Sequence, residues 1–193
     1  MNIKAKLKMY KDYFKYIMEH KVNVFKVCWK KKMYLHAITH DLSKFSPAEF
    51  FPYAEWFYGE YGTNIDSTLL LIPQIKEKHE RCKAKFEKAW RHHYRRNKHH
   101  WNHWVGTNMP IKYISQMICD WDAMSIKFGG TKYEFYMNNY DNIDLSLNSR
   151  LDLEFMIGLI GGEALVSNVT WRAHCERLNI TMLEDLKNLK YIK

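Results

Sequence analysis

Apolar residues recur at intervals of three and four along most of the chain, and this pattern predicts helices. Over residues 3–31 the apolar positions form one stripe, and His20 falls on it. The other members of this stripe are Tyr13, Ile17, Val24, Val27 and Cys28. Residues 3–31 are therefore expected to form one long helix whose striped side packs against the rest of the protein.

A second, shorter helix is expected over residues 33–42. His36 and His40 lie four residues apart in it, so their side chains share one face. That spacing allows a helix to offer two imidazoles to one metal ion. Asp41 follows His40 directly, and the next helix begins only a few residues later. The His40-Asp41 pair is thus expected just before a break between helices, where side chains can face a cleft.

The segment after this break has the composition of a capping box. Ser46 is expected as N-cap, Pro47 occupies the first helical position, and Glu49 stands three residues after Ser46. Gly59 and Gly62 end the helix that starts here.

The next helix is long and reaches about residue 97. Asp66 is expected to cap it, and Pro73 either kinks it or restarts it. His93 lies on its inner stripe. His79 shares that stripe but lies about four turns away, on the order of 20 Å, too far to share a metal ion with His93.

A helix over residues 109–128 carries a carboxylate on its apolar side. Asn108 or Thr107 is expected to cap this helix, and Gly129-Gly130 ends it. Asp120 lies among methionines on the apolar side, where an isolated carboxylate is costly to bury and needs a cation or strong donors. Further helices are expected after a capping box of Thr131 and Glu134, and over 149–160, 163–177 and 182–192.

The composition fits an ordered helical protein. Hydrophobic residues make up 47% of the 193 residues, and Gly and Pro are scarce. The longest apolar runs fall far below the roughly 20 residues of a membrane-spanning helix, and the Lys-rich N-terminus has no signal-peptide pattern. The cysteines are widely spaced, which suits thiols in a reducing compartment. We therefore expect a soluble, cytoplasmic protein with no membrane partner.

The net charge of +9 is unevenly distributed. Residues 1–32 hold ten Lys against Asp12 and Glu19, which gives +8. Residues 76–98 hold ten Lys or Arg against three Glu, which gives +7. The two basic helices either present a positive mouth to an anionic substrate or nucleic acid, or are simply solvated faces.

One set of histidines and aspartates is a candidate metal site. It begins with His20 and the pair His40-Asp41, continues with His93 and the adjacent His99 and His100, and ends with Asp120. Imidazole nitrogens and carboxylate oxygens are suitable ligands for divalent metals. The residues that rank below this set are His36, His103 and Asp122. Of His99, His100 and His103, the sequence does not decide which reach a metal.

The order of these residues resembles that of the HD-domain superfamily of metal-dependent phosphohydrolases. The segment His40-Asp41-Leu42-Ser43-Lys44-Phe45 is similar to its HD-x-G-K motif, with Ser43 in place of the usual glycine, and residues 118–125, ICDWDAMS, resemble the segment that carries its last aspartate. The resemblance implies that His20, His40, Asp41 and Asp120 hold one metal ion. It implies that Asp41 bridges to a second ion held by His93 and by His99 or His100, and that Lys44 contacts substrate phosphate.

The resemblance implies an HD-domain-like helical bundle with a small C-terminal helical extension. Residues 1–135 would form the metal-binding core, and residues 136–193 would pack on the same domain. One or two divalent ions, from among Mn, Fe, Co, Ni, Zn and Mg, would activate a water with Asp41 and Lys44 as catalytic residues. The expected partner is a phosphorylated small molecule or nucleotide. Two alternatives stay open: an iron-dependent oxygenase on the same ligands, and a non-catalytic basic module that binds nucleic acid or a protein.

Overall fold

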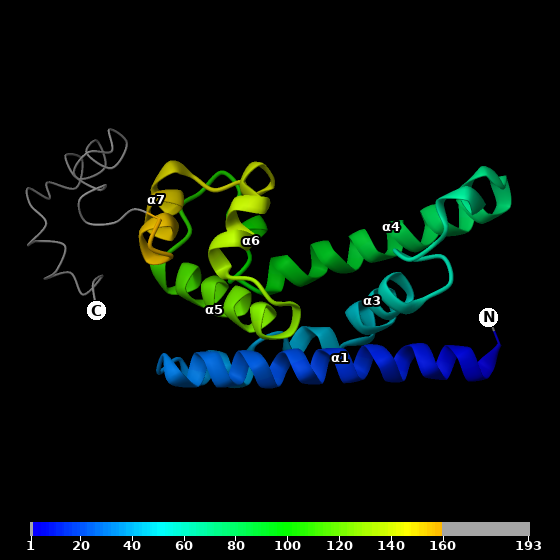
Figure 1. Ribbon diagram of the computed structural model, residues 1–193, viewed down its shortest axis with the longest axis horizontal. Coiled ribbons are helices and arrows are strands. Elements are labelled where there is room, and N and C mark those ends of the chain that lie inside the picture. Colours follow the sequence, from blue (N-terminus) through cyan, green and yellow to red (C-terminus); the bar gives the residue numbers. More distant parts are fainter. Residues whose placement is uncertain (1, 160–193) are drawn as a thin grey trace, which may run out of the picture.

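The computed structural model of the protein describes residues 2–159, and every regular element in that range is helical (Figure 1). The expected all-α fold is confirmed. The α-helices are α1 (Ile3–Lys30), α2 (Tyr34–Thr39), α3 (Pro47–Tyr58), α4 (Pro73–Arg96), α5 (Ile111–Phe128), α6 (Lys132–Asn138) and α7 (Leu147–Met156). Short 3-10 turns lie between them: η1 (Leu42–Phe45), η2 (Ser67–Leu71), η3 (Trp101–His103) and η4 (Tyr140–Asn142).

Helix α1 runs along one whole side of the molecule and organises the others (Figure 1). The helices α2, α3 and α5 pack directly on it, α4 packs on α3, and α6 and α7 pack on α5. The Asn2 side chain caps α1 by accepting a hydrogen bond of 2.8 Å from the backbone N–H of Ala5. Because one helix contacts three others, side chains from distant parts of the sequence meet along it.

The apolar stripe of α1 is buried, as the periodicity predicts. The N-terminal half of the stripe joins α3 and α4 in one cluster around Tyr13 and Tyr53. The C-terminal half joins α2 and α5 in another cluster around Val24 and Cys119. His20 lies between the two clusters along the helix and is itself buried. The core therefore leaves a polar layer at this level of α1.

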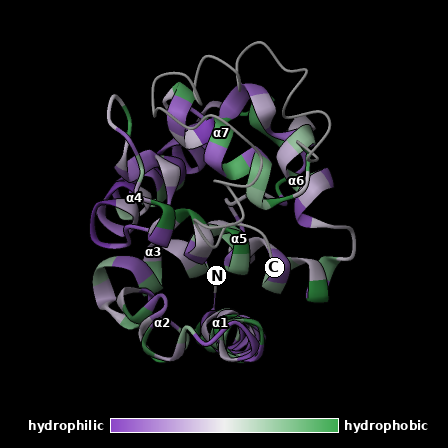
Figure 2. Ribbon diagram, turned by 90° about the vertical axis from the view of Figure 1, so that its left-hand side faces the viewer, coloured by the Kyte–Doolittle hydropathy of each residue, from purple (hydrophilic) through white to green (hydrophobic). Residues whose placement is uncertain are grey.

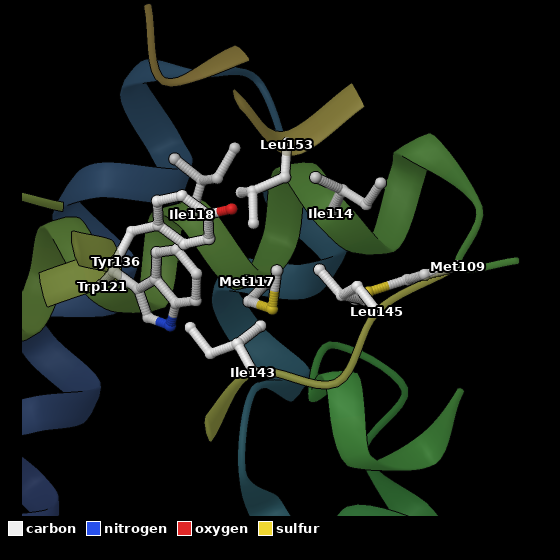
Figure 3. Packing of buried hydrophobic residues seen from close by; sticks show 9 residues of the cluster. All are labelled: Met109, Ile114, Met117, Ile118, Trp121, Tyr136, Ile143, Leu145 and Leu153. Atoms are coloured by element: carbon white, nitrogen blue, oxygen red, sulfur yellow. The ribbon is translucent and has the colours of Figure 1, made fainter. Parts of the chain in front are cut away.

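A third cluster holds α5, α6 and α7 together (Figure 3). Met117 and Trp121 of α5 face Tyr136 of α6 and Leu153 of α7, and all four are buried. This packing fixes one side of α5. The opposite side of α5 contacts α1, so the helix has little freedom to move its polar residues.

Three expected helix starts differ from the structure. The capping box at Ser46 does not form, because the Ser46 side chain makes no capping bond. The N-cap position of α5 is occupied by Pro110 and not by Thr107 or Asn108, and no side chain caps this helix. Asp66 does act as a cap, but of the short turn η2, and Pro73 then starts α4 anew.

The remaining helix predictions agree with the structure or lie outside it. The Thr131 hydroxyl accepts from the backbone N–H of Glu134 at 3.1 Å and so caps α6. The helix expected over 149–160 is α7, shifted towards the N-terminus. The helices expected over 163–177 and 182–192 lie outside the described residues. Within residues 2–159, none of the helices combines the length and the apolar character that crossing a bilayer would require.

We predict that Asp152→Asn stabilises the protein at alkaline pH. Burial on α7 raises the pKa of Asp152 to about 6, above the ordinary value of a carboxyl group in the unfolded chain. The folded state therefore prefers the protonated form, and its stability falls as the pH rises from about 4 through 6. The substitution should raise the free energy of unfolding by roughly 1–2 kcal/mol at pH 8 and change it little at pH 3.5. Urea unfolding at both pH values, with the exposed Asp144→Asn as control, measures this difference; equal effects at both pH values would contradict it.

Candidate metal centre

The histidines and aspartates singled out from the sequence converge at one buried place. They come from α1, from the turn after α2, from α4, from the loop before η3 and from α5. Six of the seven are buried, and the side chain of Asp120 is only 14% exposed. The set consists of His20, His40, Asp41, His93, His99, His100 and Asp120.

The turn that carries His40 and Asp41 has an uncommon backbone. Helix α2 ends at Thr39, the backbone of His40 leaves the helical conformation with φ of −52° and ψ of 126°, and Asp41 adopts a left-handed conformation with φ of 54°. Such a conformation costs an L-residue roughly 1–2 kcal/mol, and Asp tolerates it better than most residues. The turn directs two adjacent side chains into the same interior space. The prediction that this pair lies at a helix break is correct, although α2 ends earlier than residue 42.

One group of ligand atoms forms around His20, His40 and the carboxylates. Asp120 Oδ1 lies 3.0 Å from His20 Nε2 and 3.5 Å from His40 Nε2. The two Nε2 atoms are 3.2 Å apart, and Asp41 Oδ2 lies 3.2 Å from His40 Nε2. Around an ion with ligand distances of about 2.1 Å, neighbouring ligand atoms are about 3.0 Å apart in octahedral and about 3.4 Å apart in tetrahedral coordination. The observed separations match these edges.

A second group forms on the other oxygen of Asp41. Asp41 Oδ1 lies 3.3 Å from His93 Nε2 and 3.4 Å from His99 Nε2. The Nε2 atoms of His93 and His100 are 2.9 Å apart. One ligand atom from each of these four residues fits within 4.8 Å of the others. Both His99 and His100 therefore belong to the group, and Asp41 faces both groups with one oxygen each.

Several buried atoms at this place have no hydrogen-bond partner. Both oxygens of Asp41, Oδ1 of Asp120, Nε2 of His99 and Nδ1 of His40 are inaccessible to solvent and form no hydrogen bond. Asp41 Oδ2 does pair with the Lys44 ammonium. Imidazole nitrogens lie within 3.5 Å of the Asp41 and Asp120 oxygens, so nitrogens and oxygens surround a common space. Buried polar atoms are nearly always satisfied in folded proteins, so five exceptions in one place need a cause. A metal ion is a sufficient cause for the atoms of Asp41 and His99, because these residues belong to groups compact enough to hold one. Asp120 joins them through its contacts with His20 and His40, whereas Nδ1 of His40 lies on the other side of the ring from the Nε2 that contacts the carboxylates.

The electrostatics of the place favour charged carboxylates. Burial opposes the ionisation of Asp41 and Asp120, but the neighbouring imidazoles, together with Lys44 in the case of Asp41, hold the pKa of both carboxyl groups well below the ordinary value. Burial opposes the charging of His40, yet Asp41 and Asp120 raise its pKa to about 9. Burial lowers the pKa of His100. Anionic carboxylates and neutral imidazoles are the forms that bind metals, so His40 has to release its proton when a metal binds.

Glu49 was assigned to a capping box, and the structure corrects this. Its side chain is fully buried and accepts hydrogen bonds of 2.7 Å from Nδ1 of both His92 and His93. The Ser43 hydroxyl donates to it at 3.0 Å. With Nδ1 of His93 bonded to Glu49, Nε2 of that ring points towards Asp41. In the sequence, only the apolar residues around Glu49 on α3 indicate that this side chain is buried. Its histidine partners come from another helix, so no local pattern predicts them.

A cleft of about 320 Å³ opens onto the first group of ligands. His20, Asp120 and His100 line it together with Lys44, whose Nζ lies 2.5 Å from Asp41 Oδ2. The hydroxyls of Tyr13 and Tyr53 in its wall are buried with no hydrogen-bond partner. Its aromatic lining is Tyr13, Tyr16, Tyr53, Phe57, Phe86, Trp90, Trp101, Trp121 and Phe135.

The residues that line this cleft do not provide the positive mouth that the two basic helices could have formed. Lys44 is the single Lys or Arg among the lining residues, so the basic helices do not form a positive mouth here. Of the two tryptophans next to the adjacent histidines, Trp101 lines the cleft. Trp104 instead packs in the cluster of α5 and donates its indole N–H to the carbonyl of Lys98 at 2.8 Å.

The three residues ranked lower in the sequence, and His79, which its distance from His93 excludes, differ in their positions. His36 is buried, and its ring centroid lies 5.1 Å from that of His40, which leaves it close enough to join a ligand group with His40 and His99. His103 bonds the carbonyl of Tyr94. The last two residues are His79, which bonds the carbonyl of Tyr61, and Asp122, which pairs with Lys31 and Lys132.

Comparisons with known proteins give a family without a function. A model of the family described as "Family of unknown function (DUF5662)" matches residues 9–156. No curated protein matches the chain. No solved structure matches it either. The match covers all of the ligand residues, and the family description gives no activity.

We predict that the purified protein binds a divalent metal through these ligands. His40→Ala and Asp41→Ala should each lower the bound metal, measured by inductively coupled plasma mass spectrometry on tag-free protein, at least tenfold. The reason is that each removes a central ligand and leaves its buried neighbours unpaired. His103→Ala is the matched control, because that histidine bonds only to a nearby carbonyl. Equal metal content in all of these proteins would contradict the assignment.

We further predict that Glu49→Gln weakens metal binding without removing a ligand. A neutral amide cannot accept from both imidazoles as the carboxylate does, so His93 loses the partner that orients it. The loss of such a supporting partner costs about 10- to 100-fold in metal affinity. Competition with a fluorescent chelator gives the affinity. Glu55→Gln on the same helix, which removes only an exposed pair with Lys85, should leave it unchanged.

Proposed function

We propose that this chain, which belongs to the DUF5662 family of unknown function, is a metal-dependent phosphohydrolase that acts on a nucleotide or another phosphate ester. The observation that carries the proposal is Asp41, a buried carboxylate whose two oxygens face two separate groups of imidazoles, with Oδ2 also paired with Lys44. A carboxylate in this position suits a pair of cations better than a single one. Phosphoryl transfer is a common use of such a pair.

The proposed ligand sets follow from the distances. His20, His40, Asp41 and Asp120 would hold one ion, and Asp41, His93, His99 and His100 would hold the other. When bound, the ions supply a water of lowered pKa and neutralise phosphate oxygens. Mixed nitrogen and oxygen ligands select weakly among Mn, Fe, Co, Ni and Zn, and Mg remains a further candidate.

The chain's own groups supply position and charge. Lys44 stands at the boundary between the ligands and the cleft, where its ammonium can pair with a non-bridging phosphate oxygen of the substrate. Burial opposes its charge, but Asp41 raises its pKa, so the ammonium stays charged at neutral pH. In hydrolysis the water oxygen forms a new bond to phosphorus, the ester P–O bond breaks, and the alcohol leaves with a proton.

The aromatic cleft supports a substrate with a flat or apolar body. Trp90, Trp101 and Trp121 line it, and the walls leave room for a group the size of a nucleobase or smaller ring. Aromatic side chains stack on bases of any identity. We therefore place the phosphate at Lys44 and the ligands, and the organic group among the aromatic rings.

We also propose that the chain is a divergent relative of the HD-domain superfamily. The order of the ligands along the sequence supports this relation, and so does their origin from separate helices of an all-α fold. Ser43, which stands where the superfamily usually has glycine, makes its own contacts in this chain. Its hydroxyl donates to Glu49 and accepts from the Asn97 amide at 2.8 Å.

We predict phosphate release that depends on metal and on Lys44. Protein loaded with Mn, Co, Ni or Mg should hydrolyse p-nitrophenyl phosphate or a member of a nucleotide panel. Lys44→Met should lower kcat/KM by about 100-fold or more, because it removes a cation that stabilises charge on the phosphate. The metal content of this variant should stay within twofold of the wild type. His79→Gln, remote from the cleft, is the control that keeps full activity.

Three outcomes would contradict the hydrolase proposal. Metal-loaded protein that releases no phosphate from any substrate of the panel is the first. Oxygen uptake by the ferrous protein with a polyol, without hydrolysis, would instead favour the oxygenase alternative. Unchanged hydrolysis in both Lys44→Met and Asp41→Ala would trace the activity to a contaminant.

A further inference from the structure

A second apolar surface, separate from the core and the cleft, covers one side of α1 and the adjoining α2. The large side chains on it are exposed although they recur at helical spacing, as a buried stripe would. Leu35 is 75%, Ile38 56% and Trp29 49% exposed. We call this surface the exposed face and define it by Phe14, Met18, Phe25 and Trp29 of α1 and Leu35 and Ile38 of α2.

The exposed face is continuous rather than a scatter of single residues. With about 3.6 residues per turn, its α1 members fall within one narrow arc of the helix, away from the arc that carries His20. The rings of Phe25 and Trp29 lie 5.0 Å apart, and Trp29 meets Tyr34 of α2 at 4.6 Å. In Figure 2, α1 is seen nearly end-on at the edge of the molecule, with both green and purple on its ribbon and α2 beside it. Large contiguous apolar patches of this kind mark interaction sites.

A row of lysines borders the exposed face. The row consists of Lys8, Lys11, Lys26 and Lys30. Their side chains are exposed, and among the described residues none of them has a carboxylate within ion-pair distance. On the helical wheel Lys11 lies at the edge of the apolar arc, and the other three lysines occupy the next arc, away from the core. Asp12 and Glu19 share that arc, and Glu19 is paired with Lys127. Residues 1–32 contain ten Lys, no Arg and two acidic residues.

The positive charge of the lysines beside the exposed face indicates which partner suits this surface. A second copy of the chain would bring one row of lysines against another, at a cost in repulsion. Residues 160–193 carry five basic and four acidic residues, so they offer no complementary charge. A nucleic acid would match the charge but not the protruding leucine and isoleucine, and phosphate recognition usually enlists Arg, which this segment lacks.

We propose that the exposed face binds the surface of an anionic lipid bilayer. A helix with lysines on one side and Trp, Phe and Leu on the adjacent side lies in the interface plane, with its apolar residues about 5–10 Å into the boundary of headgroups and chains. Lysines next to it gain from the negative potential of anionic headgroups. Such binding needs no spanning helix. It is an alternative to the expectation of a protein without a membrane partner, and the test below decides between them.

Binding here leaves the candidate metal centre accessible. His20 faces the interior from the opposite part of α1, and the cleft is lined by the buried side of that helix. The proposal therefore does not depend on the phosphohydrolase activity, and the two can be tested apart.

The test is co-flotation of the full chain with large unilamellar vesicles. Vesicles of phosphatidylcholine with 30 mol% phosphatidylglycerol should carry the protein at least tenfold better than phosphatidylcholine alone. The binding should weaken as NaCl is raised from 50 to 500 mM, because salt screens the lysines. Leu35→Glu/Ile38→Glu and Lys8→Glu/Lys26→Glu should each reduce the partition at least tenfold, since each lysine near an anionic surface contributes about fivefold.

Matched controls make the test specific to this face. Leu71→Glu/Val105→Glu introduces the same charge at positions that are 84% and 56% exposed elsewhere, and Lys76→Glu/Lys83→Glu reverses charge on α4. Both should bind vesicles like the wild type, and all variants should keep their circular dichroism and metal content. Absent vesicle binding, or equal loss in the controls, would overturn the proposal. So would a result in which the face variants only convert a dimer to a monomer or only abolish binding of a DNA or RNA oligonucleotide.

Discussion

The structure depends on the burial of one carboxylate, that of Asp41, among groups that arrive from four different elements. A buried carboxylate is unfavourable by itself, and several kcal/mol are at stake if it stays unpaired. Lys44 and His40 compensate part of that cost, because both carry positive charge beside it. The remaining oxygen positions face His93 and His99 across a shared space. The packing of α1, α4 and α5 around the turn serves to hold these groups in place.

Helix α1 makes room for the buried polar groups because its apolar stripe is interrupted by a polar level. One stripe packs in two apolar clusters with His20 between them, and the layer between the clusters is where polar side chains from the turn and from α5 enter. The apolar clusters bound that layer on either side along α1, and the cleft opens onto it. They also fix α5, whose far side is held by α6 and α7, so Asp120 meets His20 without a flexible element between them.

Periodicity predicted most of the fold, and residue order predicted which histidines and aspartates come together. The long helices and the inward side of His20, His93 and Asp120 follow from local spacing, which depends on neighbours within one helix. The role of Glu49 did not follow, because its partners His92 and His93 come from α4 and no local pattern distinguishes a capping glutamate from a buried one. The left-handed Asp41 was likewise hidden, since neighbours far away in the sequence compensate its backbone cost. The choice between His99 and His100 was open for a simple reason: the loop before η3 has no periodicity to indicate direction, and both side chains turn inward.

The distribution of charge separates the two surfaces of the protein. If the lysines of the N-terminal segment served the cleft, several would line it, yet Lys44 is the one basic side chain there. A pocket with one ammonium and many aromatic rings suits a single phosphate on an apolar or flat body, because each further phosphate would need charge that the walls lack. The excess of lysines on α1 lies instead beside exposed aromatic and aliphatic residues. Uncompensated charge of one sign repels itself, and the contact with an anionic surface proposed above would relieve that repulsion.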